Sequence, residues 1–137
     1  MRPLLFILIV VATDGCIPHF ARFADHDYKI GIPKKVTVGS VMISSERGIR
    51  DENEIFMAEG NRRELIYGGV VSGSTIRIIY REYYMERGST FLKPGFSQDF
   101  TYDLTTGSTI SYQDVRIQVL EASIEFVQFK VLAGEDF

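Results

Sequence analysis

The sequence has a single cysteine, two histidines and no tryptophan among its 137 residues. One cysteine excludes a disulfide within the chain, and two histidines leave a zinc site short of its usual nitrogen and sulfur ligands. The absence of tryptophan excludes the tryptophan-centred core of an immunoglobulin-type domain. Basic side chains number 15 against 18 acidic ones, so the cation surplus that nucleic-acid binding requires is missing. We therefore expect no nucleic-acid partner, no metal and no cofactor.

The chain also lacks an apolar run long enough to cross a membrane as a helix. The run Leu4–Ala12 has nine residues. As a helix it would span about 13 Å, less than half of a bilayer core of roughly 30 Å. It follows a single positive charge at Arg2 and is soon followed by the small residue Gly15. This arrangement predicts a secretory signal peptide over residues 1–15.

The only cysteine, Cys16, comes directly after this segment, in Thr13-Asp14-Gly15-Cys16. The four residues resemble the lipobox of bacterial lipoproteins, in which the cysteine is acylated and becomes the first residue of the mature chain. Gly15 fits that pattern, whereas Thr13 and Asp14 stand where leucine and a small residue are usual. The resemblance implies attachment to a membrane through lipid on Cys16. In such lipoproteins an aspartate directly after the cysteine tends to retain the protein at the inner membrane. Ile17 stands at that position here, which favours the outer membrane, on its periplasmic side.

Residues 16–27 show no clear period, and Pro18 is expected to keep them extended, so we interpret them as a spacer. Both histidines, His19 and His26, fall in this segment. A general base has to be held against its partner, so neither is expected to be catalytic. Residues 28–137 then form one domain.

The domain has strand patterns nearly throughout. The segment Thr75–Tyr84 is dominated by β-branched and aromatic residues, with Ile76, Ile78 and Tyr80 on one face. The segment Phe96–Leu104 alternates apolar and polar residues, as in a half-buried antiparallel strand.

Weaker patterns and turn residues complete the expected fold. Further strands are expected over residues 35–38, 41–44, 55–58 and 64–67, and a final hairpin over 115–132 with a bulge near Phe126 and Val127. Turns are expected around Gly31, Gly48, Gly60, Gly73, Gly95 and Gly107. The fold class is therefore all-β, a small antiparallel β-sandwich or partly open β-barrel of about seven to nine strands, preceded by a signal peptide.

Catalytic constellations are hard to assemble from this sequence. Asp99 and Asp103 share a strand face but lie about 13 Å apart, too far for a glycosidase pair. The glycine-rich residues 68–73 are not followed by a helix pattern, so we expect them in a hairpin or bulge instead of a phosphate site. The acidic run 51–54 lacks the glycine of a calcium loop. With Cys16 acylated, no thiol nucleophile remains, and we expect that the chain is not an enzyme.

One basic and aromatic stripe offers a contact surface. Arg77, Ile79, Arg81 and Tyr83 share the second face of the segment Thr75–Tyr84. Such a stripe suits contact with an anionic glycan, a lipid headgroup or another protein. The alternative is that its arginines pair with acidic residues on a neighbouring strand, such as Asp99 and Asp103.

Several strand and turn segments resemble part of a family of uncharacterised bacterial lipoproteins. They are residues 64–67, 74–82, 94–104 and 115–122, and the likeness covers roughly residues 36–132. The resemblance implies an envelope location and a β fold, and no assigned activity. We expect a binding or structural module for an envelope protein or glycan, with a carrier of a small apolar ligand inside a barrel as the alternative.

Overall fold

The computed structural model describes residues 20–51, 57–134 and 137, which form two antiparallel sheets with no helix among them. The six-stranded sheet holds β1 (Phe20–His26), β3 (Val41–Asp51), β4 (Met57–Ser72), β5 (Thr75–Glu86), β6 (Ser89–Leu92) and β7 (Gln98–Asp103). The four-stranded sheet holds β2 (Pro33–Thr37), β8 (Thr109–Tyr112), β9 (Val115–Ala122) and β10 (Phe126–Ala133). The predicted signal peptide and Cys16 lie outside the described residues.

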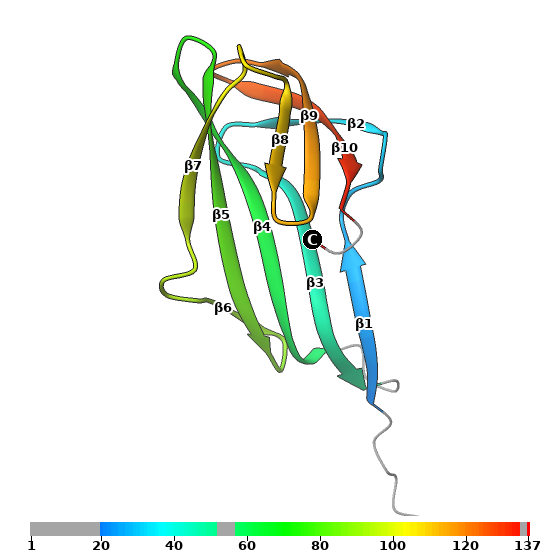
Figure 1. The fold of residues 1–137 in the computed structure, drawn as a ribbon. Coiled ribbons are helices and arrows are strands. Elements are labelled where there is room, and N and C mark those ends of the chain that lie inside the picture. The colour runs from blue at the N-terminus through cyan, green and yellow to red at the C-terminus, as the bar shows by residue number, and fades with distance from the viewer. Residues whose placement is uncertain (1–19, 52–56, 135–136) are drawn as a thin grey trace, which may run out of the picture.

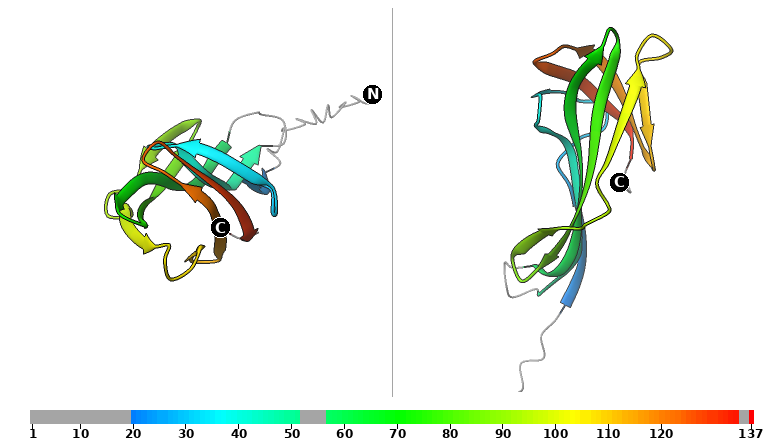
Figure 2. Two further views of the ribbon diagram at one scale, coloured as in Figure 1. Left: turned by 90° about the horizontal axis from the view of Figure 1, so that it is seen from above. Right: turned by 90° about the vertical axis from the view of Figure 1, so that its left-hand side faces the viewer.

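The two sheets pack face to face and do not close into a barrel (Figures 1 and 2). The strand orders are β1-β3-β4-β5 and β2-β10-β9-β8. β6 and β7 both pair with the edge of β5 that faces away from β4. Residues 75–80 of β5 pair with β7, and residues 83–86 pair with β6. The predicted all-β antiparallel fold is confirmed, and of the two expected forms, a sandwich or a partly open barrel, the structure has two separate sheets. The described residues form ten strands where about seven to nine were expected.

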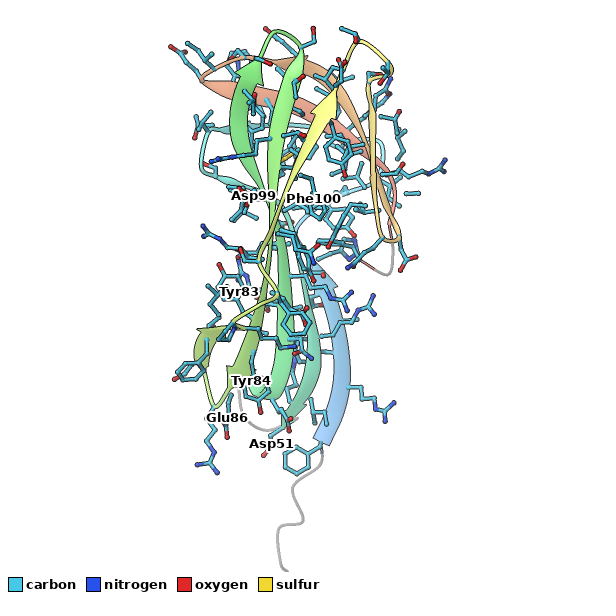
Figure 3. All side chains as sticks on the ribbon, turned by 60° about the vertical axis from the view of Figure 1, so that its left-hand side comes forward. Asp51, Tyr83, Tyr84, Glu86, Asp99 and Phe100 are labelled. Carbon is cyan, nitrogen blue, oxygen red and sulfur yellow. The ribbon has the colours of Figure 1, made fainter. Side chains whose placement is uncertain are left out.

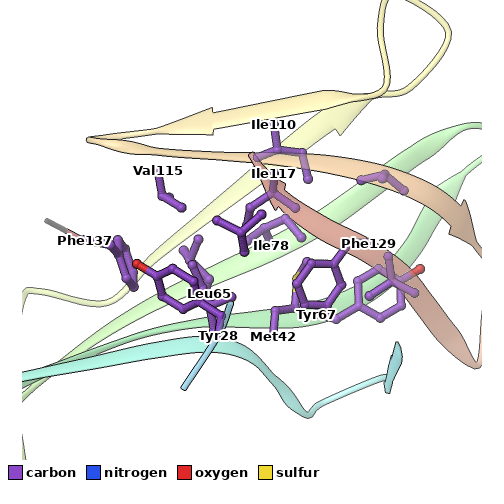
Figure 4. Packing of buried hydrophobic residues seen from close by; sticks show 14 of the residues in the cluster. Tyr28, Met42, Leu65, Tyr67, Ile78, Ile110, Val115, Ile117, Phe129 and Phe137 are labelled. Atoms are coloured by element: carbon purple, nitrogen blue, oxygen red, sulfur yellow. The ribbon is translucent and has the colours of Figure 1, made fainter. Parts of the chain in front are cut away.

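The core lies between the sheets and follows from strand alternation. Leu65 and Tyr67 on β4 and Ile78 on β5 face Ile117 on β9 and Phe129 on β10 (Figure 4). All five side chains are at most 1% exposed. Burying a side chain of this size contributes about 1.5–3 kcal/mol, so this cluster provides much of the domain's stability.

The six-stranded sheet extends beyond the sandwich as a single layer. The extension consists of β1, residues 46–51 of β3, 57–63 of β4, 82–86 of β5, and β6, and the four-stranded sheet lies entirely at the other end (Figure 2). No member of the buried core cluster comes from these parts of the described chain. Figure 3 shows side chains projecting from both faces of the extension. Long strands with two exposed faces are therefore a main feature of this fold.

Two glycines that the sequence placed in turns lie instead inside long strands. Gly48 of β3 is directly opposite Gly60 of β4. A Cβ on Gly48 would lie 2.7 Å from the Gly60 Cα and would also collide with the Glu59 carbonyl oxygen. The glycines thus allow close approach of the β3 and β4 backbones. The prediction of turns at these two positions is wrong. As a result, the expected strands over 55–58 and 64–67 belong to one strand, β4, as far as the structure describes them.

The N-terminal boundary of the domain needs a correction as well. The expected spacer over residues 16–27 includes β1, whose seven residues pair with β3 without a register shift. The sequence Phe20-Ala21-Arg22-Phe23-Ala24 alternates imperfectly because β1 lies at an edge of the single-layer extension. Neither of its faces has to be uniformly apolar there, and the periodicity that marks a half-buried strand is lost.

The final hairpin forms, but its irregularities fall elsewhere than predicted. Register shifts separate Gln128 from Phe129 and Val131 from Ala133, and neither lies at Phe126. The odd-numbered Val127 and Phe129 are buried, whereas the even-numbered side chains nearby are not. Ile124 is 76% exposed in the turn, and the Phe126 ring packs under the Lys35 ammonium, 3.5 Å from the ring centroid, on the outside of the sheet.

Candidate partner-contact surface

The predicted stripe of Arg77, Ile79, Arg81 and Tyr83 lies on one face of β5, as the alternation requires. The core residues Ile76, Ile78 and Tyr80 are at intervening positions and point toward the four-stranded sheet. The stripe therefore lies on the opposite side, the outer face of the six-stranded sheet. Arg77 is exposed, and the other three side chains are half-buried among their neighbours.

Acidic side chains from adjacent strands lie beside the stripe. The Arg77 Nη1 is 3.8 Å from the Asp99 Oδ2 on β7, and both side chains are about half exposed. Arg81 is directly opposite Glu64 on β4. The expected cross-strand pairing is thus observed for Asp99. An ion pair at such an exposed site contributes less than about 1 kcal/mol, so the guanidinium of Arg77 can exchange partners at little cost.

A more buried ion cluster lies next to Arg81 and Tyr83. The Arg62 Nε donates to Glu64 at 2.7 Å, and the Arg62 Nη1 donates to Glu46 at 2.8 Å. Burial opposes the charged guanidinium, but the hydrogen bonds and charges of the two carboxylates outweigh it and raise the pKa of Arg62. With one guanidinium and two carboxylates the cluster has a formal charge of −1, which Arg81 opposite Glu64 balances.

The second acidic candidate, Asp103, has a local structural role. Its carboxylate accepts hydrogen bonds from the Thr105 amide at 2.9 Å and from the Thr105 hydroxyl at 2.7 Å. These bonds lower the pKa of Asp103. The geometry is that of an Asx turn after β7, so Asp103 shapes the turn and does not pair with the stripe.

An ionic and aromatic group on the inner face was not anticipated from the sequence. The Lys93 Nζ donates to Glu82 at 2.6 Å, and the Tyr80 hydroxyl donates to the other Glu82 oxygen at 3.1 Å. The Tyr112 ring packs 5.1 Å from Tyr80 and 4.7 Å from Phe100, centroid to centroid. Lys93 belongs to the loop after β6, and no spacing rule links it to a strand residue 11 positions earlier.

The protonation of this group follows from its surroundings. Burial, together with the charge and the hydrogen bond of Glu82, raises the pKa of Tyr80 to about 12. Burial opposes the charge on Glu82, yet the hydrogen bonds from Lys93 and Tyr80 outweigh burial and lower its pKa. The carboxylate is therefore held ionised and occupied by two donors. Its evident effect is to fix the loop after β6 to the base of the sandwich.

His26 is part of β1 and not of a spacer. Its ring packs against Tyr28 at a centroid distance of 4.5 Å. A hollow of about 360 Å³ beside it is lined partly by Asp25 and Asp27. The Arg50 guanidinium lies 2.9 Å from Asp25, and the Lys34 ammonium lies 3.0 Å from Asp27.

Nowhere in residues 20–51, 57–134 and 137 do three His, Cys, Asp or Glu side chains group as metal ligands would. Most of the acidic run 51–54 lies outside those ranges.

A larger hollow of about 620 Å³ opens on the extension, between β1, β3 and β4. Arg22, Arg47 and Glu59 line it together with Ile49 and Asn61. Its lining includes both apolar and charged residues. The hollow lies on the inner face of the six-stranded sheet, at a level that the four-stranded sheet does not reach. It is an open groove on a sheet face.

Comparison with known proteins gives no further assignment. No protein-family model, no curated protein and no solved structure matches the chain. None of the helices that a membrane span would require is found in the part of the chain that the structure describes. The resemblance to bacterial lipoproteins therefore stays a prediction, and the class that the structure itself defines is a two-sheet antiparallel β protein.

Proposed function

We propose that this chain is a lipoprotein of the bacterial cell envelope whose β domain acts as a binding or structural module. Lipid on Cys16 holds it to the outer membrane on the periplasmic side, and the domain contacts an envelope protein or glycan. The observation that carries the proposal is the stripe of Arg77, Ile79, Arg81 and Tyr83 on the outer face of the six-stranded sheet. No catalytic step, metal or cofactor is assigned to it.

The charge balance of the outer face supports a protein as the partner over a polyanionic glycan. Asp99 lies beside Arg77, and Glu64 lies opposite Arg81, so the stripe has no surplus of positive charge to attract a polyanion. A mixed surface with an aromatic and two arginines is typical of protein interfaces, where tyrosine and arginine contribute most of the binding energy.

The alternative, carriage of an apolar ligand, has less support. It requires a hollow interior, and the two sheets do not close into a barrel. The space between them is occupied by large side chains such as Tyr67, Phe129 and Phe137, each at most 1% exposed. Interiors packed in this way leave no room for a ligand without displacing core residues.

Site-specific photocrosslinking in intact cells tests the contact. A benzophenone amino acid replaces Tyr83 in the stripe or, as the matched control, Leu120, which is 45% exposed on β9. We expect one discrete product from position 83, none from position 120, and loss of the product when Arg77→Glu is added. The same product from both positions, or none from position 83, would contradict a role for the stripe.

Metabolic labelling with palmitate tests the anchor separately. The wild-type chain should be labelled and should leave the membrane only with detergent, whereas Cys16→Ser should be neither labelled nor retained. Because each buried lipid CH₂ contributes about 0.8 kcal/mol to membrane attachment, the loss should be nearly complete. Equal labelling of both chains would exclude acylation of Cys16.

A further inference from the structure

The free edge of β1 is the longest strand edge that the described residues leave without cover. β1 pairs with β3 over all seven residues, and no described strand pairs with its other side. It contains no proline and no bulge between Phe20 and His26. Such an edge is a ready template for another strand, and proteins usually protect it.

The other edges of the two sheets are protected. β2 begins with Pro33 and continues with two lysines, and β6 and β8 have four residues each. β7 has six residues, two of them aspartates, and its Tyr102 hydroxyl donates to the Ser111 carbonyl of β8 at 3.2 Å. Proline, charged side chains (lysine above all) and short length are the usual means of blocking edge pairing. β1 has two charged side chains, Arg22 and Asp25, but it has no proline and no lysine and is seven residues long.

The register of β1 fixes which backbone groups point outward. The Asp27 amide donates to the Ser44 carbonyl, and His26 lies opposite Ser45. In an antiparallel ladder the residues bonded to one neighbour alternate with those directed to the other side. The odd-numbered residues of β1 therefore bond to β3. Phe20, Arg22, Ala24 and His26 direct their amides and carbonyls to the open edge.

We propose that β1 pairs antiparallel with β1 of a second copy of this chain, around a two-fold axis at Phe23. In this register Phe20 lies opposite His26 of the other copy, and Arg22 lies opposite Ala24. All four outward residues then form hydrogen-bonded pairs, and the two six-stranded sheets become continuous. The two Phe23 side chains meet on the axis at a non-hydrogen-bonded position, where side chains approach most closely and aromatic pairs are favourable.

The charges on β1 and β3 fit this register. No like charges lie directly opposite each other, because Arg22 meets Ala24 and Asp25 meets Ala21. On β3, Arg50 is the cross-strand neighbour of Ala21. Arg50 of one copy and Asp25 of the other would thus flank the small Ala21 side chain, with backbones about 10 Å apart across two strand spacings. Within one copy Arg50 already lies 2.9 Å from Asp25 and packs on the Phe23 ring at 4.1 Å. Pairing would join the guanidinium to a second carboxylate.

Disulfide mapping tests the register with the full chain purified in detergent. Chains with Ala21→Cys and Asp25→Cys are mixed under mild oxidation, one of them carrying a tag so that mixed dimers are distinguishable. Positions 21 and 25 of different copies lie directly opposite, within disulfide reach, whereas position 21 lies about 13 Å from its own counterpart. We expect the mixed product to form at least about tenfold faster than either like-with-like product, with the wild-type chain as the control that lacks an engineered cysteine.

A proline on the open edge provides the second test. The Ala24 amide points away from β3, so Ala24→Pro leaves the β1–β3 ladder intact and blocks only the proposed pairing. Added to both cysteine chains, it should slow mixed crosslinking about tenfold or more, because each dimer loses a hydrogen bond from both copies. Measured at a protein concentration too low for pairing, the thermal unfolding midpoint should stay unchanged.

Three results would overturn the proposal. One is mixed crosslinking no faster than like-with-like crosslinking, which does not depend on the proline variant. Another is mixed crosslinking that persists in folded Ala24→Pro. The third is a strand of a different protein on this edge, seen when the same cysteine chains are oxidised in intact cells as crosslinks from positions 21 and 25 to that protein and none between copies.

Discussion

Replacing Tyr67 with phenylalanine should weaken the link between the two sheets. Tyr67 on β4 is fully buried, and its hydroxyl donates to the Ser123 carbonyl in the turn between β9 and β10 at 2.6 Å. Tyr67→Phe keeps the ring and its packing, so no cavity opens. The change removes one hydrogen bond and leaves the Ser123 carbonyl without this donor. Together these effects should cost about 1–2 kcal/mol of unfolding free energy.

Thermal and urea unfolding followed by circular dichroism measure this loss. For a domain of this size it corresponds to a fall in melting temperature of about 5–10 °C. Tyr102→Phe is the matched control, because the Tyr102 hydroxyl donates to a carbonyl at an exposed site and at 3.2 Å. The control should change stability by less than about 0.5 kcal/mol. Equal losses of unfolding free energy in the two variants would refute the argument that burial makes the Tyr67 hydrogen bond more stabilising than an exposed one.

Three further predictions concern the inner face and the strand glycines. Lys93→Met should raise the pKa of Glu82 and cost about 1–2 kcal/mol near neutral pH, measured by urea unfolding, whereas an unchanged stability would contradict the role given to this ion pair. Because the pKa of Tyr80 is raised to about 12, its contribution to stability should be complete below pH 10 and disappear as the pH rises through 12. Burial also raises the pKa of Tyr67, Tyr102 and Tyr112, so an absorbance titration at alkaline pH should show several late tyrosines. The part that titrates near pH 12 should be missing in Tyr80→Phe, and an unaltered titration in that variant would exclude the assignment. Gly48→Ala should destabilise the domain by about 1–3 kcal/mol, and Gly107→Ala, which meets no neighbouring atom, by less than about 0.5 kcal/mol; similar melting temperatures for the two variants would contradict close backbone approach.

The sequence was most informative where a strand is covered on one face. For β5 the expected span Thr75–Tyr84 differs from the observed one only at its end, and Ile76, Ile78 and Tyr80 are buried as the alternation predicts. Tyr84 has the same parity yet is only half-buried, because it lies on the extension, where no second sheet is present. Alternation reports which residues share a face, and it does not report whether that face has a partner.

Glycines were the main source of error in strand boundaries. A lone Gly48 or Gly60 is an ordinary turn residue when each is considered separately. Their meaning depends on the pairing of β3 with β4, which brings the two positions opposite each other. Such a long-range relation cannot be obtained from neighbouring residues in the chain. Gly73, by contrast, stands in the expected hairpin turn with a φ of 52°.

The candidate surface was predicted in composition but not in setting. The shared face of Arg77, Ile79, Arg81 and Tyr83 follows from period-2 alternation alone. The ion cluster centred on Arg62 depends on cross-strand register, and the Lys93–Glu82 pair depends on the path of a loop. Of these contacts only the Arg62–Glu64 pair has a sequence spacing that marks it, because the two residues are two positions apart on one strand.

The direction in which β1 enters the domain has a mechanical consequence. Phe20 lies at the end of β1 farthest from the sandwich, and the strand then runs toward it (Figure 1). A pull on the chain ahead of Phe20, along the strand axis, would load every β1–β3 hydrogen bond at once, in shear. Pulling in the reverse sense would peel the bonds apart one after another. The edge strand is therefore oriented to withstand tension from its N-terminal side.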